Sequence, residues 1–285
     1  MPALDTAKDA PTSVSTELCF IRPPADRKPA FLSAALNGGR PKYLFESEAR
    51  SVRVHDLRVR HPKPSVDREG FELHRAPSAV EDLHDDAQVD RVYRPEVEEL
   101  LRACLGATEV VTFDVTRRSD AAQGASNPDG SRGPATRVHV DYTVASGPKR
   151  AAQVLGEERA RSHLEAGGRI LQVNVWRPIR GPVERAPLAV ADASSIAPAD
   201  LIATDQRFPG RTGEIYLLRH APGQRWYYAP RMTRDEVLLL KGWDSSDDGR
   251  ARFTPHSAFQ LPDTPAGAAP RESFEVRAFV LVNAG

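Results

Sequence analysis

A histidine and an aspartate stand two positions apart in the segment RVHVDYT (137–143), among residues that favour extended structure. Side chains at positions i and i+2 of a strand leave the same face, so His139 and Asp141 are predicted to point into one space. A second histidine, His256 in FTPHSAF, follows far along the chain. Two histidines and one carboxylate bind iron in non-haem Fe(II) oxygenases and leave positions open for a cosubstrate and dioxygen. The three residues therefore predict a metal-binding catalytic centre.

The pattern H-x-D/E is not specific, and the chain contains it at two other places. His84 and Asp86 lie in an acidic stretch with little strand character. His163 and Glu165 lie in a predicted helix, where positions i and i+2 diverge by about 200°. Only the pair at 139 and 141 has a strand context that directs both side chains to one side. A strand histidine without a metal, next to a surface aspartate, is the alternative interpretation.

A candidate anchor for an anionic cosubstrate follows His256 in the segment APRESFEVRAF (269–279). 2-Oxoglutarate needs a cation for its distal carboxylate, and a guanidinium binds a carboxylate through two parallel hydrogen bonds. We predict that Arg271 binds this carboxylate and that the Ser273 hydroxyl assists. Arg277, in the same strand, is the competing candidate, and surface salt bridges are the alternative role for both arginines.

Five further residues are candidates for the walls of a pocket. Asn174 and Trp176 share one face of a predicted strand, and Trp176 is expected either to contact cosubstrate or substrate or to pack in the core. Arg177 ends that strand, where it either binds a carboxylate or lies exposed. Tyr228 and Lys241 belong to mixtures of aromatic and polar residues that suit a substrate pocket. Their alternative roles are a core cover for Tyr228 and a structural ion pair for Lys241.

The elements that must position these residues are mostly short strands. From about residue 109 onward, short β-rich segments separated by turns are typical of a β-sandwich or a jelly-roll barrel, here decorated by helices. A capping-box pattern, Thr233 with Glu236, favours a helix at 233–241. Strands are expected at 17–21, 52–59, 108–115, 137–143, 169–178, 187–196, 213–220, 224–230, 251–259 and 272–283, and helices at 94–107, 147–168 and 233–241.

Composition limits the class of protein. The 285 residues are 40% hydrophobic, and 39 Lys and Arg balance 39 Asp and Glu, so no net field favours nucleic acid or an anionic membrane. Two cysteines are too few for a disulfide framework. The chain has no membrane-spanning apolar run and no signal-peptide pattern. We expect a cytoplasmic protein with a mobile segment at 1–17 and a single domain at 18–285, which carries a loop insertion at 119–136.

Five blocks in fixed order resemble the CmcJ/AsaB-type hydroxylase/desaturase family, which includes the fungal gibberellin desaturase and a cephamycin methoxylation protein. The resemblance covers about residues 90–282. It implies a mainly β fold with flanking helices, the double-stranded β-helix (jelly roll, cupin-like), and an enzyme of secondary metabolism that uses Fe(II), 2-oxoglutarate and O2. It also implies His139, Asp141 and His256 as iron ligands and Arg271 with Ser273 as the anchor. The blocks are RVYRPEVEELLRACLGATEVVTFDVTRR, VHVDYT, NVWRPI with GPVERAPLAVADASSI, RWYYAPRMTRDEVLLLKGWDS, and TPHSAF with PRESFEVR.

The predicted function is that of a non-haem Fe(II)/2-oxoglutarate-dependent dioxygenase. It would hydroxylate, desaturate or cyclise a small secondary-metabolite or amino-acid-derived substrate. One alternative is a non-redox metal-dependent enzyme on the same barrel, which needs no 2-oxoglutarate anchor. Another is a non-catalytic partner protein in a biosynthetic pathway. The insertion at 119–136 precedes the metal-binding strand, so we expect it to line or cover the pocket.

Overall fold

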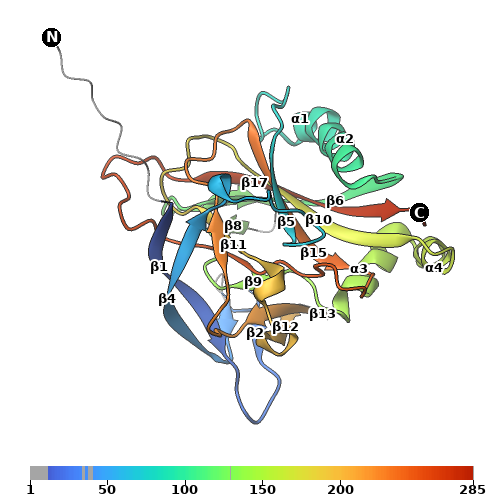
Figure 1. Ribbon diagram of the computed structural model, residues 1–285, viewed down its shortest axis with the longest axis horizontal. Helices are drawn as coiled ribbons and strands as arrows, with labels where there is room; N and C mark the ends of the chain where they lie inside the picture. The colour runs from blue at the N-terminus through green and yellow to red at the C-terminus, as the bar shows by residue number, and fades with distance from the viewer. Residues whose placement is uncertain (1–11, 34–35, 38–40, 129, 285) are drawn as a thin grey trace.

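Two β-sheets pack against each other in the computed structural model, which describes residues 12–33, 36–37, 41–128 and 130–284 (Figure 1). In this part of the chain the larger sheet has ten strands and the smaller sheet has five. The larger sheet has the order β1 (Ser13–Arg22), β4 (Glu46–Asp56), β14 (Trp226–Tyr228), β11 (Leu188–Ala191), β16 (His256–Ala258), β9 (His139–Val140), β13 (Arg211–Leu218), β12 (Leu201–Phe208), β2 (Ala30–Leu32) and β3 (Lys42–Tyr43). The smaller sheet has the order β5 (Phe71–Arg75), β15 (Glu236–Asp244), β10 (Arg169–Pro178), β17 (Glu272–Val282) and β6 (Glu109–Ser119).

The smaller sheet is buried on both faces at its centre. Strand β10 occupies the predicted segment 169–178 and alternates as expected. Leu171, Val173 and Val175 pack in a core cluster that also contains residues of helix α2 (Arg94–Leu105). Trp176, on the opposite face, packs with residues of the larger sheet. The alternation therefore places one face of β10 toward the space between the two sheets.

Helix α2 covers the outer face of the smaller sheet, and two later helices pack against the opposite face of the same sheet. Helix α2 confirms the predicted helix at 94–107: Pro95 stands in its first turn, and Gly106 ends it with a left-handed φ of 63°. The helix expected at 147–168 is two helices, α3 (Ser146–Leu155) and α4 (Glu157–Glu165). Gly156 separates them because its φ of 92° lies outside the helical range. A short helix α1 (Asp86–Gln88) and a π-helical turn (Val89–Tyr93) precede α2.

The prediction of a helix at 233–241 is wrong, because most of this segment belongs to strand β15, which begins at Glu236. Its apolar residues alternate between two core clusters, with Val237 and Leu239 in one and Leu238 and Leu240 in the other. A helix buries one stripe, whereas a central strand buries both faces. The capping-box hydrogen bond from the Thr233 backbone to Glu236 is present, but it precedes a strand.

Two expected boundaries also change. Strand β1 begins at Ser13 and pairs with β4 along its whole length, so ordered structure starts before residue 18, and residues 1–11 lie outside the described residues. The insertion at 119–136 is not a plain loop, because it contains a hairpin of β7 (Ala125–Asn127) and β8 (Gly130–Arg132). The Asn127 side-chain amide joins this hairpin to β6: its oxygen accepts from the Arg117 backbone N–H, and its nitrogen donates to the Arg117 carbonyl.

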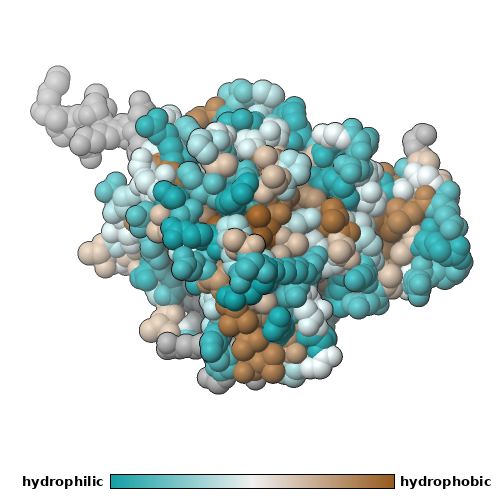
Figure 2. All heavy atoms as spheres, turned by 90° about the horizontal axis from the view of Figure 1, so that it is seen from below, coloured by the Kyte–Doolittle hydropathy of each residue, from teal (hydrophilic) through white to brown (hydrophobic). Residues whose placement is uncertain are grey.

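The surface carries a mixture of polar and apolar residues. Figure 2 shows one face on which hydrophilic side chains predominate and hydrophobic ones gather in patches. Among the described residues, no helix has the length and hydrophobicity that crossing a bilayer requires.

Candidate active site

His139 and His256 are direct cross-strand partners, which explains how residues so distant in sequence meet. His139 begins β9, His256 begins β16, and the two antiparallel strands pair at these residues. Their ring centroids lie 4.4 Å apart. Asp141 follows β9 directly, with Oδ1 3.7 Å from Nε2 of His139. One potential ligand atom from each of the three residues lies within 4.8 Å of the others. The structure therefore brings the three predicted metal ligands together.

The backbone orients both imidazoles. Nδ1 of His139 lies 2.8 Å from the Arg137 carbonyl, and Nδ1 of His256 lies 2.9 Å from the Thr254 carbonyl. A carbonyl oxygen only accepts hydrogen bonds, so each Nδ1 carries the proton and each Nε2 presents its lone pair. Burial, followed by the neighbouring His256, lowers the pKa of His139 to about 3. Both features suit a neutral imidazole that binds a metal.

Two side chains of the smaller sheet hold the Asp141 carboxylate. Asn174 donates Nδ2–H to Oδ2 at 2.7 Å, and Nη2 of Arg277 lies 3.2 Å from the same oxygen. Burial alone would raise the pKa of Asp141, but the charge of Arg277 lowers it below the ordinary value. Gln172 adds a further hydrogen bond to this network, because its Nε2 donates to Asn174 Oδ1 at 2.7 Å. Asp141 is thus kept ionised, with Oδ1 on the side of His139.

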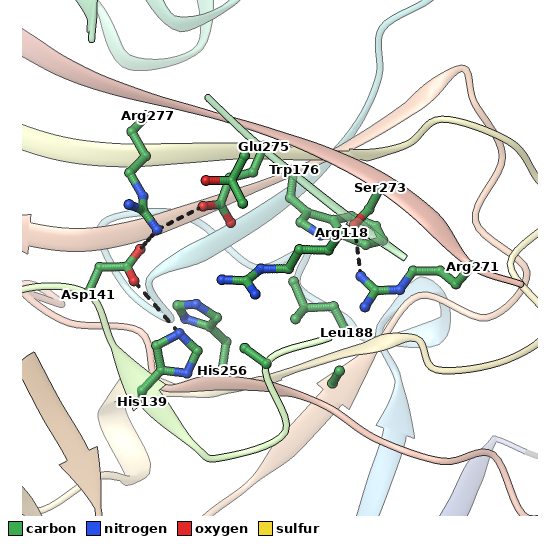
Figure 3. A pocket seen from close by; sticks show the side chains of 13 residues that line it. Arg118, His139, Asp141, Trp176, Leu188, His256, Arg271, Ser273, Glu275 and Arg277 are labelled. Atoms are coloured by element: carbon green, nitrogen blue, oxygen red, sulfur yellow. Dashed lines mark hydrogen bonds and ion pairs between the residues drawn. The ribbon is translucent and has the colours of Figure 1, made fainter. Parts of the chain in front are cut away.

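Arg271 and Ser273 lie together at the other end of the pocket (Figure 3). Nη1 of Arg271 donates to Ser273 Oγ at 2.8 Å, while its Nε and Nη2 have no hydrogen-bond partner among the described residues. Only 3% of Arg271 is exposed, and burial lowers its pKa to about 10. A guanidinium with unused donors in a buried pocket fits a bidentate carboxylate. The buried donors of this arginine therefore fit the distal end of 2-oxoglutarate.

Arg277 does not fit the same role, which corrects its candidacy as the anchor. Besides Asp141, its guanidinium contacts Asp114 at 3.0 Å and Glu275 at 3.2 Å. These carboxylates raise its pKa well above the ordinary value despite burial. An arginine with three carboxylate partners has little capacity left for another.

The pocket between these groups has walls from both sheets. Trp176 lines it, with its ring centroid 5.8 Å from the Arg271 guanidinium, and also packs in the core. Leu188 and Ala258 line it from the larger sheet. Ala135 lines it from the insertion at 119–136, which agrees with the expectation that this segment reaches the pocket. The side of the larger sheet thus contributes the proposed metal ligands together with apolar residues, whereas the lining residues of the smaller sheet are mostly polar.

Four expected substrate contacts do not line the pocket. Arg177 faces away from the pocket by strand parity, and its Nε donates to the Tyr93 hydroxyl at 2.7 Å. Tyr228 packs against Phe259 in a core cluster. Lys241 is fully buried and pairs with Asp244, so its alternative role as a structural ion pair is the one that the structure shows. Asn174 contacts Asp141 and does not line the pocket. None of the four is placed to touch a substrate there.

Each of the two other H-x-D/E pairs has one residue bound elsewhere. His163 Nε2 contacts the backbone carbonyls of Arg169 and Val282, and Asp86 pairs with Arg117. Among the described residues, the only group of three ligating side chains close enough for one metal ion is that of His139, Asp141 and His256.

Sequence reasoning missed Arg118 and Glu275, which also line the pocket. Both lie on the inner face of the smaller sheet, where β6 residue Arg118 pairs with Ser273 of β17 and Thr116 pairs with Glu275. Alternation along β6 could have revealed Arg118, because residues 116 and 118 share a face of the strand. The expected strand ended at residue 115, however, whereas β6 runs to Ser119.

Comparisons with known proteins identify the family. Residues 18–281 match the family described as Oxidoreductase/YMDC permease-like domain. Alpha-ketoglutarate-dependent dioxygenase phiK of a fungal species is 35% identical over 240 residues, which cover 82% of this chain and 84% of the relative. Hydroxylase/desaturase efuI of Hormonema carpetanum is 30% identical over 298 residues, 97% of both chains. Fe(II)/2-oxoglutarate-dependent dioxygenase nvfI of Aspergillus novofumigatus is 31% identical over 278 residues, 94% of this chain and 97% of the relative.

The fold has a solved counterpart. The structure of the iron and alpha-ketoglutarate-dependent endoperoxidase NvfI superposes with a TM-score of 0.85 at 29% identity, covering 96% of this chain and 100% of that one. The predicted jelly roll, the predicted cofactors and the predicted dioxygenase class are confirmed. The chain belongs to the CmcJ/AsaB-type hydroxylase/desaturase family of Fe(II)/2-oxoglutarate-dependent dioxygenases.

Proposed function

We propose that His139, Asp141 and His256 bind the Fe(II), and that Arg271 with Ser273 binds the distal carboxylate of 2-oxoglutarate. One observation carries this proposal: the three ligating side chains and the unused donors of Arg271 open on the same pocket. A metal enzyme without redox chemistry would not need an anchor for 2-oxoglutarate.

Each residue has a physical task in this arrangement. The two imidazoles offer Nε2 because the backbone holds Nδ1, and Asp141 offers Oδ1 because Asn174 and Arg277 hold Oδ2. Bound iron, with 2-oxoglutarate and dioxygen, supplies the removal of hydrogen from an unactivated carbon. The protein binds and orients the reactants and excludes water.

The substrate we propose is a small molecule of secondary metabolism, handled in the cytoplasm without nucleic acid or membrane. The relatives are named as hydroxylase/desaturase and as endoperoxidase, so one iron centre supports different outcomes in this family. We infer that the walls of the pocket, among them Trp176 and Leu188, select the outcome by deciding which carbon faces the iron.

The metal assignment is tested by iron content. Protein loaded with Fe(II) without oxygen should hold one iron per chain, and His256→Ala should lose most of it, because a ligand is removed from a three-ligand site. His84→Ala is the matched control, since His84 is an exposed histidine in a second H-x-D pattern. If His256→Ala retained one iron per chain at unchanged affinity, the proposed ligand set would be wrong.

The cosubstrate assignment is tested by succinate release that depends on Fe(II), 2-oxoglutarate and O2. Arg271→Gln should raise KM for 2-oxoglutarate by about 10-fold or more, because a charge-assisted pair is lost. Arg180→Gln is the control, since this exposed arginine pairs with Glu272 beside the anchor. An unchanged KM in Arg271→Gln would refute the anchor.

A further inference from the structure

Arg118 is a pocket cation to which the proposed function assigns no ligand. Its side chain lines the pocket, and Nη1 donates to the Gly133 carbonyl at 2.9 Å. No carboxylate of the described residues lies within ion-pair distance of its guanidinium, in contrast to Arg277, which has three such partners. Burial lowers the pKa of Arg118, yet a guanidinium stays charged at neutral pH. The carboxylate that acts on it most strongly, Glu275, forms its ion pair with Arg277, so Arg118 has no ion-pair partner among the described residues.

The register places Arg118 between the two ends of the pocket. Arg118 lies directly across from Ser273 in the β6–β17 pair, so the side chain starts beside the anchor. In Figure 3 it extends from there toward the two histidines. Arg118 lines the same pocket as Arg271 and Ser273 at one end and as His139 and His256 at the other (Figure 3). The guanidinium therefore lies close to the metal ligands as well as to the anchor.

The neighbouring arginine shows that this orientation is specific. Arg117 points to the other side of β6, where Nε donates 2.8 Å to the Leu83 carbonyl and Nη2 contacts Asp86 at 2.6 Å. All of its contacts are structural. Arg118 contributes one bond to the backbone and presents its other donors to the cavity.

The Arg118 guanidinium lies where bound 2-oxoglutarate would place a negative charge. With the distal carboxylate at Arg271 and the keto-acid end at the iron, the second negative charge of 2-oxoglutarate is its C1 carboxylate, at the metal end. We propose that Arg118 binds the C1 carboxylate of 2-oxoglutarate, so that one arginine holds each end of the cosubstrate. This inference rests on the proposed function. It assigns to Arg118 the recognition of the carboxylate next to the keto group, whereas Arg271 recognises the distal carboxylate.

The test uses two ligands that differ at C1 alone. 4-Oxopentanoate keeps the keto group and the distal carboxylate of 2-oxoglutarate but carries a methyl group in place of the C1 carboxylate. Binding is measured on full-length protein loaded with Zn(II), which prevents turnover, by calorimetry for 2-oxoglutarate and by ligand-observed NMR for 4-oxopentanoate. The variants are Arg118→Gln, Arg118→Lys and Arg271→Gln, each checked for its melting temperature.

Arg118→Gln should weaken 2-oxoglutarate by about 10- to 100-fold and leave 4-oxopentanoate within about twofold. Arg118→Lys should recover part of the 2-oxoglutarate affinity, because the charge is retained. Arg271→Gln should weaken both ligands. The inference is overturned if Arg118→Gln leaves 2-oxoglutarate affinity unchanged, or if it weakens both ligands equally. Failure of Arg271→Gln to weaken either ligand would instead contradict the proposed anchor.

Discussion

Arg277 and Asp141 form an ion pair with 3.2 Å between Nη2 and Oδ2, so one of the two arginines offered by the sequence as an anchor is bound to a proposed iron ligand. The pair also links the two sheets, since Arg277 belongs to β17 and Asp141 follows β9. The smaller sheet thereby holds the carboxylate, while the larger sheet supplies both histidines. We expect iron affinity to depend on residues that do not touch the metal.

Arg277→Gln should lower Fe(II) affinity by about 10- to 100-fold, because the charge that holds Asp141 ionised and oriented is lost. The measurement is a titration of metal-free protein with Fe(II) without oxygen. Asp114→Asn is the control, since it removes another partner of Arg277 and leaves the contact with Asp141. Equal losses in the two variants would mean that the arginine acts through general stability.

Asn174→Ala should lower Fe(II) affinity by about 10-fold, because Asp141 loses a 2.7 Å hydrogen bond. Gln172→Ala should have a smaller effect, since Gln172 reaches Asp141 only through Asn174. The double variant should bind iron no more weakly than Asn174→Ala alone. Additive losses in the same titration would show that Gln172 acts by another route.

Lys241→Met should lower the free energy of unfolding by about 3 kcal/mol without changing KM for substrate. Lys241 is fully buried and bonds Asp244 at 2.7 Å and Asp67 at 2.9 Å, so its removal leaves a buried carboxylate with less compensation. Urea denaturation measures the change, and the exposed Arg250→Ala should cost under about 0.5 kcal/mol. A stable Lys241→Met with a raised substrate KM would restore the pocket role.

His74 should make stability fall as the pH rises from about 6.5 to about 9. The contact with Cys104, followed by that with Glu72, raises its pKa to about 9, above the ordinary value of about 6.5. The stabilisation is complete below the unfolded pKa and is lost as the pH passes through the folded one. We expect the free energy of unfolding to fall by about 1–2 kcal/mol over this pH range, since partial solvent exposure of His74 weakens its contacts.

Urea denaturation at pH 6 and pH 9 checks this. His74→Gln should show a flatter dependence on pH, and the exposed His84→Gln should behave like the unaltered protein. A His74→Gln variant with the full pH dependence would assign the effect to other groups.

The sequence by itself determined the features that depend on local periodicity. The spacing of His139 and Asp141 directed both to one side, and the alternation along 169–178 correctly separated Trp176 from Arg177. Side-chain direction follows from position in a strand, whatever the strand packs against. The order of motifs toward the C-terminus predicted a second histidine and an arginine with a serine two positions on, and the structure brings these residues to one pocket.

The tertiary structure decided which charged group meets which. Arg271 directly precedes β17, Arg277 lies within it, and both line one pocket. Only the register with β6 and β10 shows that Arg277 pairs with Asp114 and Asn174. The register also identifies Arg118 as a pocket residue, because it pairs with Ser273 across the two strands. Burial of both faces turned the segment 233–241 from an expected helix into a strand. Cross-strand register and burial arise from contacts between distant segments, and local sequence patterns do not contain them.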